Sequence, residues 1–269
     1  MLQVPSLAAD CNISHFITTR HGGVSEGTFA SFNPCLYGAD DEAAVKENRS
    51  RLAEAVGLPF ERLMAARQVH GDRILVLDEA FAALTADEQR ARLDGSDGWI
   101  TRVPDLCLTV QTADCVPLLF YDPVLKVVAA AHAGWRGTAL KIGAKCVQLM
   151  KTAFGCRPEN LRAGIGPSIG LKAFEVGDEV VDAFAVIGTP MEQVMYRDAS
   201  TGKAHLDLWE INRLQLLDAG LLAGHIEVAG ICTFTACEDF FSARRLGIRS
   251  GRICSGIFLK GEACERQGE

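Results

Sequence analysis

The sequence lacks the features that direct a protein to nucleic acid or into a membrane. Its formal net charge is −7, whereas DNA, RNA and anionic lipid surfaces attract basic proteins, so any phosphate must be held locally. No apolar run approaches the roughly 20 residues of a membrane span, and the N-terminus has no basic segment followed by an apolar one. We therefore expect a cytoplasmic protein whose partners are small molecules.

Paired cysteine motifs are also absent. The ten cysteines are scattered along the chain without a Cys-X-X-Cys pair, and the sequence has no low-complexity segment and no obvious internal repeat. Cys232 and Cys237 stand five positions apart, with no second cysteine or histidine pair nearby to complete a zinc site. Reduced thiols, most of them in the core, are the simpler interpretation.

Several segments have the residue pattern of helices. Asp40 or Asp41 can cap a helix that Gly57 ends, and on this helix Arg49 falls about 40° from Val45, on the apolar stripe. A charged side chain on an apolar face needs a partner. Further helices are predicted at 85–92, 138–154 and 207–219.

The most apolar block of the chain, residues 105–134, predicts three adjacent strands of a buried sheet, "DLCLTVQT", "VPLLFYD" and "KVVAAAHAG". A pair of short strands joined near Gly71 precedes the block, and "IEVAGICTF" and "RICSGIFLK" follow it. Strands and helices mix without a regular βα alternation, which favours a mixed α/β sandwich over a TIM barrel or a doubly wound fold. No stretch has the composition of an interdomain linker, so residues 1–269 are expected to form one domain.

Three side chains that can bind metal lie at the ends of neighbouring predicted strands: His70, Cys115 and His132. Two neutral imidazoles and a thiolate form a three-ligand zinc site with the fourth position left for water, the arrangement typical of catalytic zinc. Zinc held in this way lowers the pKa of its water to near neutrality. A second interpretation needs no metal, because His132 could deprotonate Cys115 to give a nucleophilic thiolate. The residues alone leave both open.

Three arginines are candidates for binding an anion, since guanidinium forms bidentate pairs with phosphate. They are Arg20 in "TRHGGVS", Arg49 on the predicted helix and Arg136 in "GWRG". Each could instead form a structural ion pair. The inward direction of Arg49 favours a functional role for it.

The sequence resembles the YfiH family, also called the laccase-domain or multicopper polyphenol oxidase family. The motifs "TRHGGVSEG", "ENR", "QVHG", "TVQTADCVPLL", "AAAHAGWRGT", "GIGPSIG", "FEVG", "LDLWEINR" and "FFSARR" occur in the order seen in that family, from about Thr18 to Leu259. The resemblance implies a single-domain α/β/β/α sandwich. It also implies a metal site made of the residues at His70, Cys115 and His132, with zinc as the metal and copper as an alternative.

The activity implied by the resemblance is that of a purine nucleoside enzyme: phosphorolysis of adenosine, inosine and methylthioadenosine, with adenosine deamination alongside. Arg49 matches the arginine of "ENR", which is similar to the phosphate contact of the family. With it we group Arg20, Arg136 and Asn33 as candidate phosphate or substrate contacts. Asp114 is a candidate proton carrier beside Cys115 and His132, and the protein is expected to be a monomer or a small homo-oligomer.

The resemblance has departures and leaves rival functions. Phe174 and Ala243 stand where the family often has tyrosine, so hydrogen bonds from those hydroxyls are not expected. A four-copper laccase needs about ten histidines, many in His-X-His pairs, whereas this chain has six and no such pair. The remaining alternatives are a zinc or cysteine amidohydrolase that edits a cell-wall precursor, a copper-binding polyphenol oxidase, and a metal-buffering or protein-interaction module.

Overall fold

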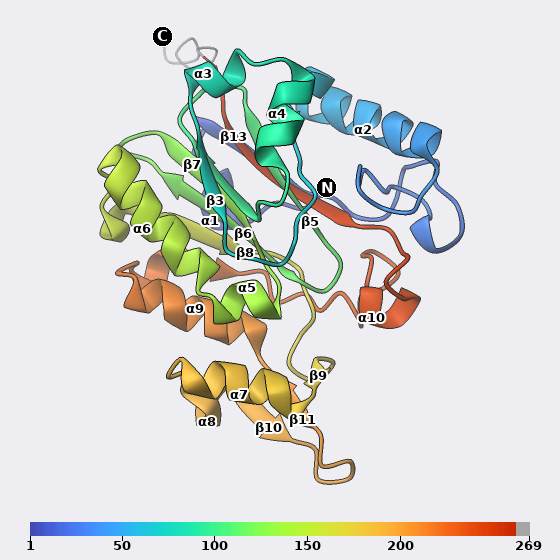
Figure 1. Cartoon of the computed structure of the whole chain (residues 1–269), viewed down its shortest axis with the longest axis vertical. Coiled ribbons are helices and arrows are strands. Elements are labelled where there is room, and N and C mark those ends of the chain that lie inside the picture. The colour runs from blue at the N-terminus through green and yellow to red at the C-terminus, as the bar shows by residue number, and fades with distance from the viewer. Residues whose placement is uncertain (262–269) are drawn as a thin grey trace.

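Two β-sheets lie face to face at the centre of the protein (Figure 1). The computed structural model describes residues 1–261. In spatial order, the four-stranded sheet consists of β1 (Ile13–Ile17), β13 (Ile253–Leu259), β5 (Cys107–Thr112) and β2 (Leu63–Met64). The six-stranded sheet consists of β12 (Ile226–Val228), β8 (Arg162–Ile165), β6 (Val116–Asp122), β7 (Val127–Ala133), β4 (Gly98–Thr101) and β3 (Ile74–Leu77).

Both faces of each sheet are covered. Because side chains alternate along a strand, neighbouring residues of one strand enter two different cores. On β6, Leu119 and Tyr121 belong to the core between the sheets, whereas Leu118 and Phe120 pack on the opposite face, toward helices. Phe258 of β13 packs against the helix that covers the outer face of the four-stranded sheet. The result is the four-layer α/β/β/α sandwich that the sequence resemblance implies.

The outer layers are made of three main helices. The helices α6 (Ile142–Phe154) and α9 (Leu208–Asp218) cover the six-stranded sheet, and α2 (Glu42–Val56) covers the four-stranded one (Figure 1). The shorter helices are α1 (Pro5–Ala8), α3 (Glu79–Ala82), α4 (Ala86–Leu93), α5 (Trp135–Ala139), α7 (Asp178–Val186), α8 (Met191–Val194) and α10 (Ala243–Leu246). Single 3-10 turns occupy Gly27–Phe29, Phe60–Arg62, Pro158–Asn160 and Ala223–His225.

The helix α2 confirms its sequence-based prediction at both ends. The Asp41 carboxylate accepts a hydrogen bond from the Ala44 N–H at 2.9 Å, and Gly57 ends the helix with a φ of 71°. A residue without Cβ adopts this left-handed conformation without strain. Arg49 is 1% exposed, which confirms the predicted inward direction.

Two predicted strand pairings were wrong. β5 lies in the four-stranded sheet, whereas β6 and β7 pair with each other in the six-stranded one, so the segment between β5 and β6 crosses from one sheet to the other. β2 and β3 are likewise split between the sheets. Strands buried on both faces show no polar alternation, and their sequences therefore do not say which sheet they join. The predicted helix 138–154 is also interrupted, because Lys141 is left-handed with a φ of 59°.

A small third sheet lies at the lower end of Figure 1, next to α7 and α8. It consists of β10 (Met195–Arg197), β11 (Ala204–Leu206) and β9 (Glu175–Val176). Within residues 1–261, none of the helices combines the length and the apolar character that crossing a bilayer requires.

Candidate metal centre

The structure brings His70, Cys115 and His132 together, as the sequence predicted. Their donor atoms lie within 4.8 Å of one another, and this is the one such group of three or more among residues 1–261. The two imidazole rings meet edge to face, with centroids 4.7 Å apart and an interplanar angle of 79°. His132 is buried, Cys115 is half-buried and His70 is exposed, so one side of the cluster faces solvent.

The sheet crossover explains why the three side chains meet. His132 pairs with Pro117 across β6 and β7, which places it beside the end of β6 where Cys115 enters. The chain turns sharply next to Cys115, since Asp114 has a φ of 84°. His70 also has a left-handed backbone, with a φ of 61°, in the loop between β2 and β3.

Asp97, an aspartate in the segment "GSDG", connects two of these segments. It is 0% exposed and precedes β4. Its Oδ1 lies 2.8 Å from Nδ1 of His132. The main-chain N–H groups of Val69, His70 and Gly71 donate to the same carboxylate at 2.8 to 3.2 Å. A carboxylate on the non-ligating nitrogen of a histidine is a common feature of metal sites.

Gly134 leaves the space that the cluster occupies. A Cβ on this residue would lie 3.0 Å from Sγ of Cys115 and 3.0 Å from Cδ2 of His70. Both distances are shorter than ordinary van der Waals contact between such atoms. The glycine of "HAGWRG" therefore has a steric function at this site.

The electrostatics of the metal-free cluster favour a thiolate beside an imidazolium. Burial raises the pKa of Cys115, but the charge of His132 and hydrogen bonds from His132 and His70 outweigh burial and lower the pKa to about 6. Burial lowers the pKa of His132, but Cys115 and Asp97 outweigh it and raise the pKa to about 9. A thiolate is both the form that binds metal and the form that acts as a nucleophile.

The donor set fits a metal ion. Zinc with bonds of about 2.0–2.1 Å to nitrogen and about 2.3 Å to sulfur places tetrahedral ligands about 3.5 Å apart, within the spread of this cluster. Because Nδ1 of His132 is engaged by Asp97, its Nε2 is the atom left for the metal. His70, Cys115 and His132 would therefore hold the ion.

Asp114 lies next to Cys115, but both of its carboxylate oxygens have protein partners. Oδ1 accepts a hydrogen bond from the Thr233 hydroxyl at 2.7 Å, and Oδ2 accepts one from the Arg244 N–H at 2.6 Å. The Arg244 guanidinium lies 5.7 Å from the ring centroid of Phe174. Asp114 thus ties the crossover to the start of α10, and its role as a proton carrier stays a prediction.

Two of the predicted substrate contacts, Arg20 and Asn33, donate hydrogen bonds to other parts of the protein. Arg20 donates to the carbonyl oxygens of Ala30 at 2.8 Å and Cys237 at 2.9 Å. Asn33 is 1% exposed, donates to Asp40 and accepts from the Arg252 N–H. These contacts hold both residues in the fold, and their role as substrate contacts stays a prediction.

Arg136 is placed differently. It stands two residues after Gly134, is exposed, and lies 4.4 Å from the Trp135 ring centroid. Its guanidinium has no hydrogen bond or ion pair with the residues that the structure describes. It is therefore available to a ligand near the cluster.

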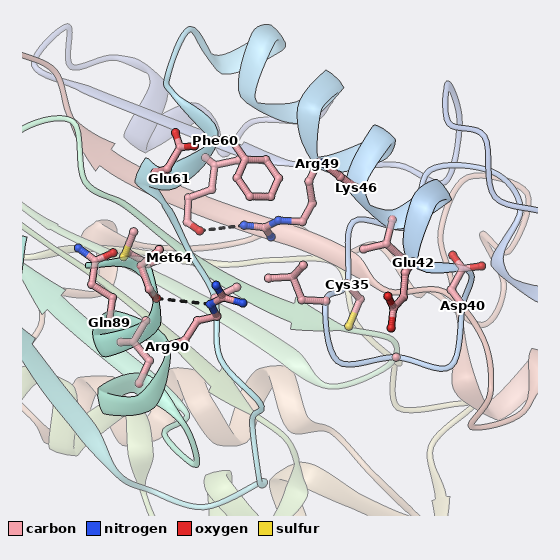
Figure 2. Close-up of a pocket in the computed structure, with 17 residues that line it drawn as sticks. Cys35, Asp40, Glu42, Lys46, Arg49, Phe60, Glu61, Met64, Gln89 and Arg90 are labelled. Carbon is pink, nitrogen blue, oxygen red and sulfur yellow. Dashed lines mark hydrogen bonds between the residues drawn. The ribbon is translucent and has the colours of Figure 1, made fainter. Parts of the chain in front are cut away.

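Arg49 lines a cavity of about 710 Å³ between α2 and α4 (Figure 2). Its Nη2 donates to the Leu63 carbonyl oxygen at 2.9 Å, its guanidinium lies 5.0 Å from the Phe60 centroid, and its Nε has no partner in the described part of the chain. Burial lowers its pKa, which nearby thiols and the Tyr37 phenol partly offset. The same cavity is also lined by the carboxylates of Asp40, Glu42 and Glu61. None of the three candidate metal ligands lines this cavity.

Comparison with known proteins gives full-length matches. Residues 14–260 match the family described as "Multi-copper polyphenol oxidoreductase laccase". A purine nucleoside phosphorylase of Bacteroides thetaiotaomicron is 46% identical over 259 residues, 96% of this chain and 96% of that protein. A protein from an unknown prokaryotic organism, named as an adenosine deaminase, is 41% identical over 248 residues, 92% of this chain and 94% of that protein.

Two solved structures share the fold. The hypothetical protein YfiH of Bacillus licheniformis superposes with a TM-score of 0.85 at 37% identity, covering 92% of this chain and 93% of its own. YlmD from Geobacillus stearothermophilus gives a TM-score of 0.84 at 37% identity, covering 93% of each chain. These matches confirm both the predicted fold and the resemblance on which it rested. The chain belongs to the YfiH family, the family of multi-copper polyphenol oxidoreductase laccases.

Proposed function

We propose that the chain is a zinc-dependent purine nucleoside phosphorylase that also deaminates adenosine. The observation that carries the proposal is the cluster of His70, Cys115 and His132. It occurs in a chain 46% identical to a purine nucleoside phosphorylase and 41% identical to an adenosine deaminase. The proposed substrates are adenosine, inosine and S-methyl-5′-thioadenosine, with inorganic phosphate.

The residues of the cluster have separate tasks in this proposal. Cys115 supplies a thiolate, and His132 presents Nε2 because its Nδ1 faces Asp97 at 2.8 Å. His70, Cys115 and His132 would hold zinc, which would supply a Lewis acid that activates water. His70 is the exposed member, so the nucleoside approaches from its side of the cluster.

Phosphorolysis also needs cations that orient phosphate toward the anomeric carbon of the ribose. Arg136 supports this role because it follows the cluster directly and its guanidinium has no polar partner in residues 1–261. Arg49 matches the phosphate contact of the family and is a buried cation that forms no ion pair within residues 1–261. It lines a cavity that contains none of the three candidate metal ligands. We assign the first phosphate contact to Arg136 and keep Arg49 and Arg20 as further candidates.

The family description includes copper oxidation, but the histidines favour nucleoside chemistry. A four-copper oxidase needs about ten histidines, and this chain has six. His15 accepts a hydrogen bond from the Val4 N–H, and His205 stacks on Tyr196, both outside the cluster. The histidines therefore supply too few ligands for a mononuclear and a trinuclear copper site.

Incubation of zinc-loaded protein with adenosine, with and without phosphate, tests the proposal. Adenine and ribose 1-phosphate are expected only when phosphate is present, and inosine is expected in both conditions. The same protein stripped of metal serves as the control. If zinc-loaded protein yields none of these products, the proposal is wrong, and amide substrates become the next class to assay.

A further inference from the structure

Asp97 occupies a position from which one carboxylate reaches two of the ligand-bearing segments. It lies in the turn that precedes β4, where its own N–H donates to the Arg73 carbonyl oxygen at 3.0 Å. Its carbonyl oxygen accepts the His132 N–H at 2.7 Å. Both its backbone and its side chain therefore contact the strand that carries His132.

Both oxygens of the Asp97 carboxylate have two polar partners each. Oδ1 meets Nδ1 of His132 at 2.8 Å and the His70 N–H at 3.0 Å, and Oδ2 accepts the Gly71 N–H at 2.8 Å and the Val69 N–H at 3.2 Å. Burial raises the pKa of Asp97, but the hydrogen bonds from His132 and from the main chain outweigh burial and lower it. Three main-chain N–H groups donate to its two oxygens, an arrangement that a carboxylate anion satisfies.

These contacts act on both histidines at once. An anion on Nδ1 fixes the tautomer and the ring orientation of His132 and makes Nε2 a stronger donor. Three consecutive N–H groups on one carboxylate hold the loop around His70, whose left-handed φ of 61° costs about 1 kcal/mol in an unsupported chain.

We propose that Asp97 is a positioning residue that sets the geometry of His70 and His132 before metal binds. The inference deepens the proposed function, since it concerns the same cluster. It does not depend on which substrate is turned over, because its readout is metal affinity. It requires that the metal-free protein already holds both histidine rings in the arrangement that binds metal.

Zinc affinity of an Asp97→Asn variant tests the inference, measured by competition with a chromophoric chelator. An amide places an N–H where one main-chain N–H now donates, so we expect affinity to fall about 10- to 100-fold. The matched control is Asp122→Asn. Asp122 is another fully buried aspartate, whose Oδ1 caps the turn at the far end of β6 and β7. Its variant should bind zinc within about twofold of the wild type. Equal affinities for the Asp97→Asn variant and the wild type would overturn the inference.

A second measurement uses the unmodified protein and so does not depend on the folding of a variant. In ¹⁵N NMR of the zinc-loaded protein, we expect His132 to carry its proton on Nδ1 and to bind through Nε2. Ligation of His132 through Nδ1 would refute the positioning role. If both measurements succeed but no nucleoside is converted, the proposed function fails while the role of Asp97 stands.

Discussion

The Cα of Gly134 faces the sulfur of Cys115 so closely that a Cβ there would lie 3.0 Å from Sγ. The same Cβ would lie 3.0 Å from the His70 ring. The protein keeps this space empty of side chain, between two candidate metal ligands that are 45 positions apart in the sequence. Close approach of this kind requires glycine.

A Gly134→Ala variant should therefore bind zinc at least 10-fold more weakly and lose most of its activity. The added methyl group would be too close to both Cys115 and His70, so at least one of them must shift. A shift of either residue disrupts the set of three ligands. Chelator competition and a nucleoside assay measure the two effects. Gly224→Ala is the matched control, since a Cβ at Gly224 meets nothing within 4 Å and its φ is not left-handed. Wild-type zinc affinity in Gly134→Ala would contradict the steric argument.

A Cys115→Ala variant separates the two interpretations of the thiol. If Cys115 is a ligand, the variant should lose both bound zinc and activity, because two imidazoles alone hold zinc weakly. If the thiolate is the nucleophile, activity should disappear while zinc is retained. Metal analysis of the purified variant beside its turnover rate distinguishes these results, and we expect the first. Cys146→Ala, at a buried thiol of α6, controls for the loss of any cysteine.

Local features of the fold could be predicted from the sequence, whereas the pairing of the sheets could not. The caps of α2 at Asp41 and Gly57 involve residues at most a few positions apart, so the sequence contains all the information. The split between β5 and β6 depends on tertiary burial, and both strands are fully buried along their length. A continuous apolar strand fits either sheet equally well.

The candidate site likewise contains residues that could be predicted from the sequence and one that could not. His70, Cys115 and His132 were predictable because their side chains are metal ligands beside predicted strands. The strand predicted to end at His70 was wrong, because β2 ends at Met64 and His70 lies in the loop before β3. Asp97 was not, because an aspartate in "GSDG" is an ordinary turn residue, and its partners lie 26 to 35 positions away. A buried partner for a ligating histidine is required by chemistry, but only the folded chain shows which carboxylate supplies it.

An Arg136→Gln variant should raise the KM for phosphate about 10-fold or more and leave adenosine deamination within about twofold. A cation that orients phosphate contributes roughly 1.4 kcal/mol or more to its binding, which corresponds to a tenfold change. Initial rates at varied phosphate concentration measure the effect. Arg102→Gln is the control, an exposed arginine just beyond the end of β4 that lies away from the cluster. An unchanged KM for phosphate in Arg136→Gln would remove this residue from the proposed phosphate site.

Protonation of His15 should lower the free energy of unfolding in mild acid. It is 1% exposed, and its Nε2 accepts a hydrogen bond from the Val4 N–H at 2.8 Å, which an imidazolium cannot do. Burial lowers its pKa to about 4, although the charge of Glu227 opposes this shift. In the unfolded chain the histidine pKa is about 6.5. Between about pH 6.5 and pH 4, His15 is therefore protonated in the unfolded chain and neutral in the folded one.

The sign of the effect follows from that difference. Above about pH 6.5, His15 should add no pH dependence to the free energy of unfolding. As the pH drops from there toward 4, the free energy of unfolding should fall by up to about 1.4 kcal/mol per pH unit. Urea unfolding at several pH values between 7 and 4.5 measures the slope. A His15→Gln variant keeps an acceptor for the Val4 N–H but cannot titrate, so its slope should be shallower by up to one proton. Equal slopes for the variant and the wild type would show that another group governs acid unfolding.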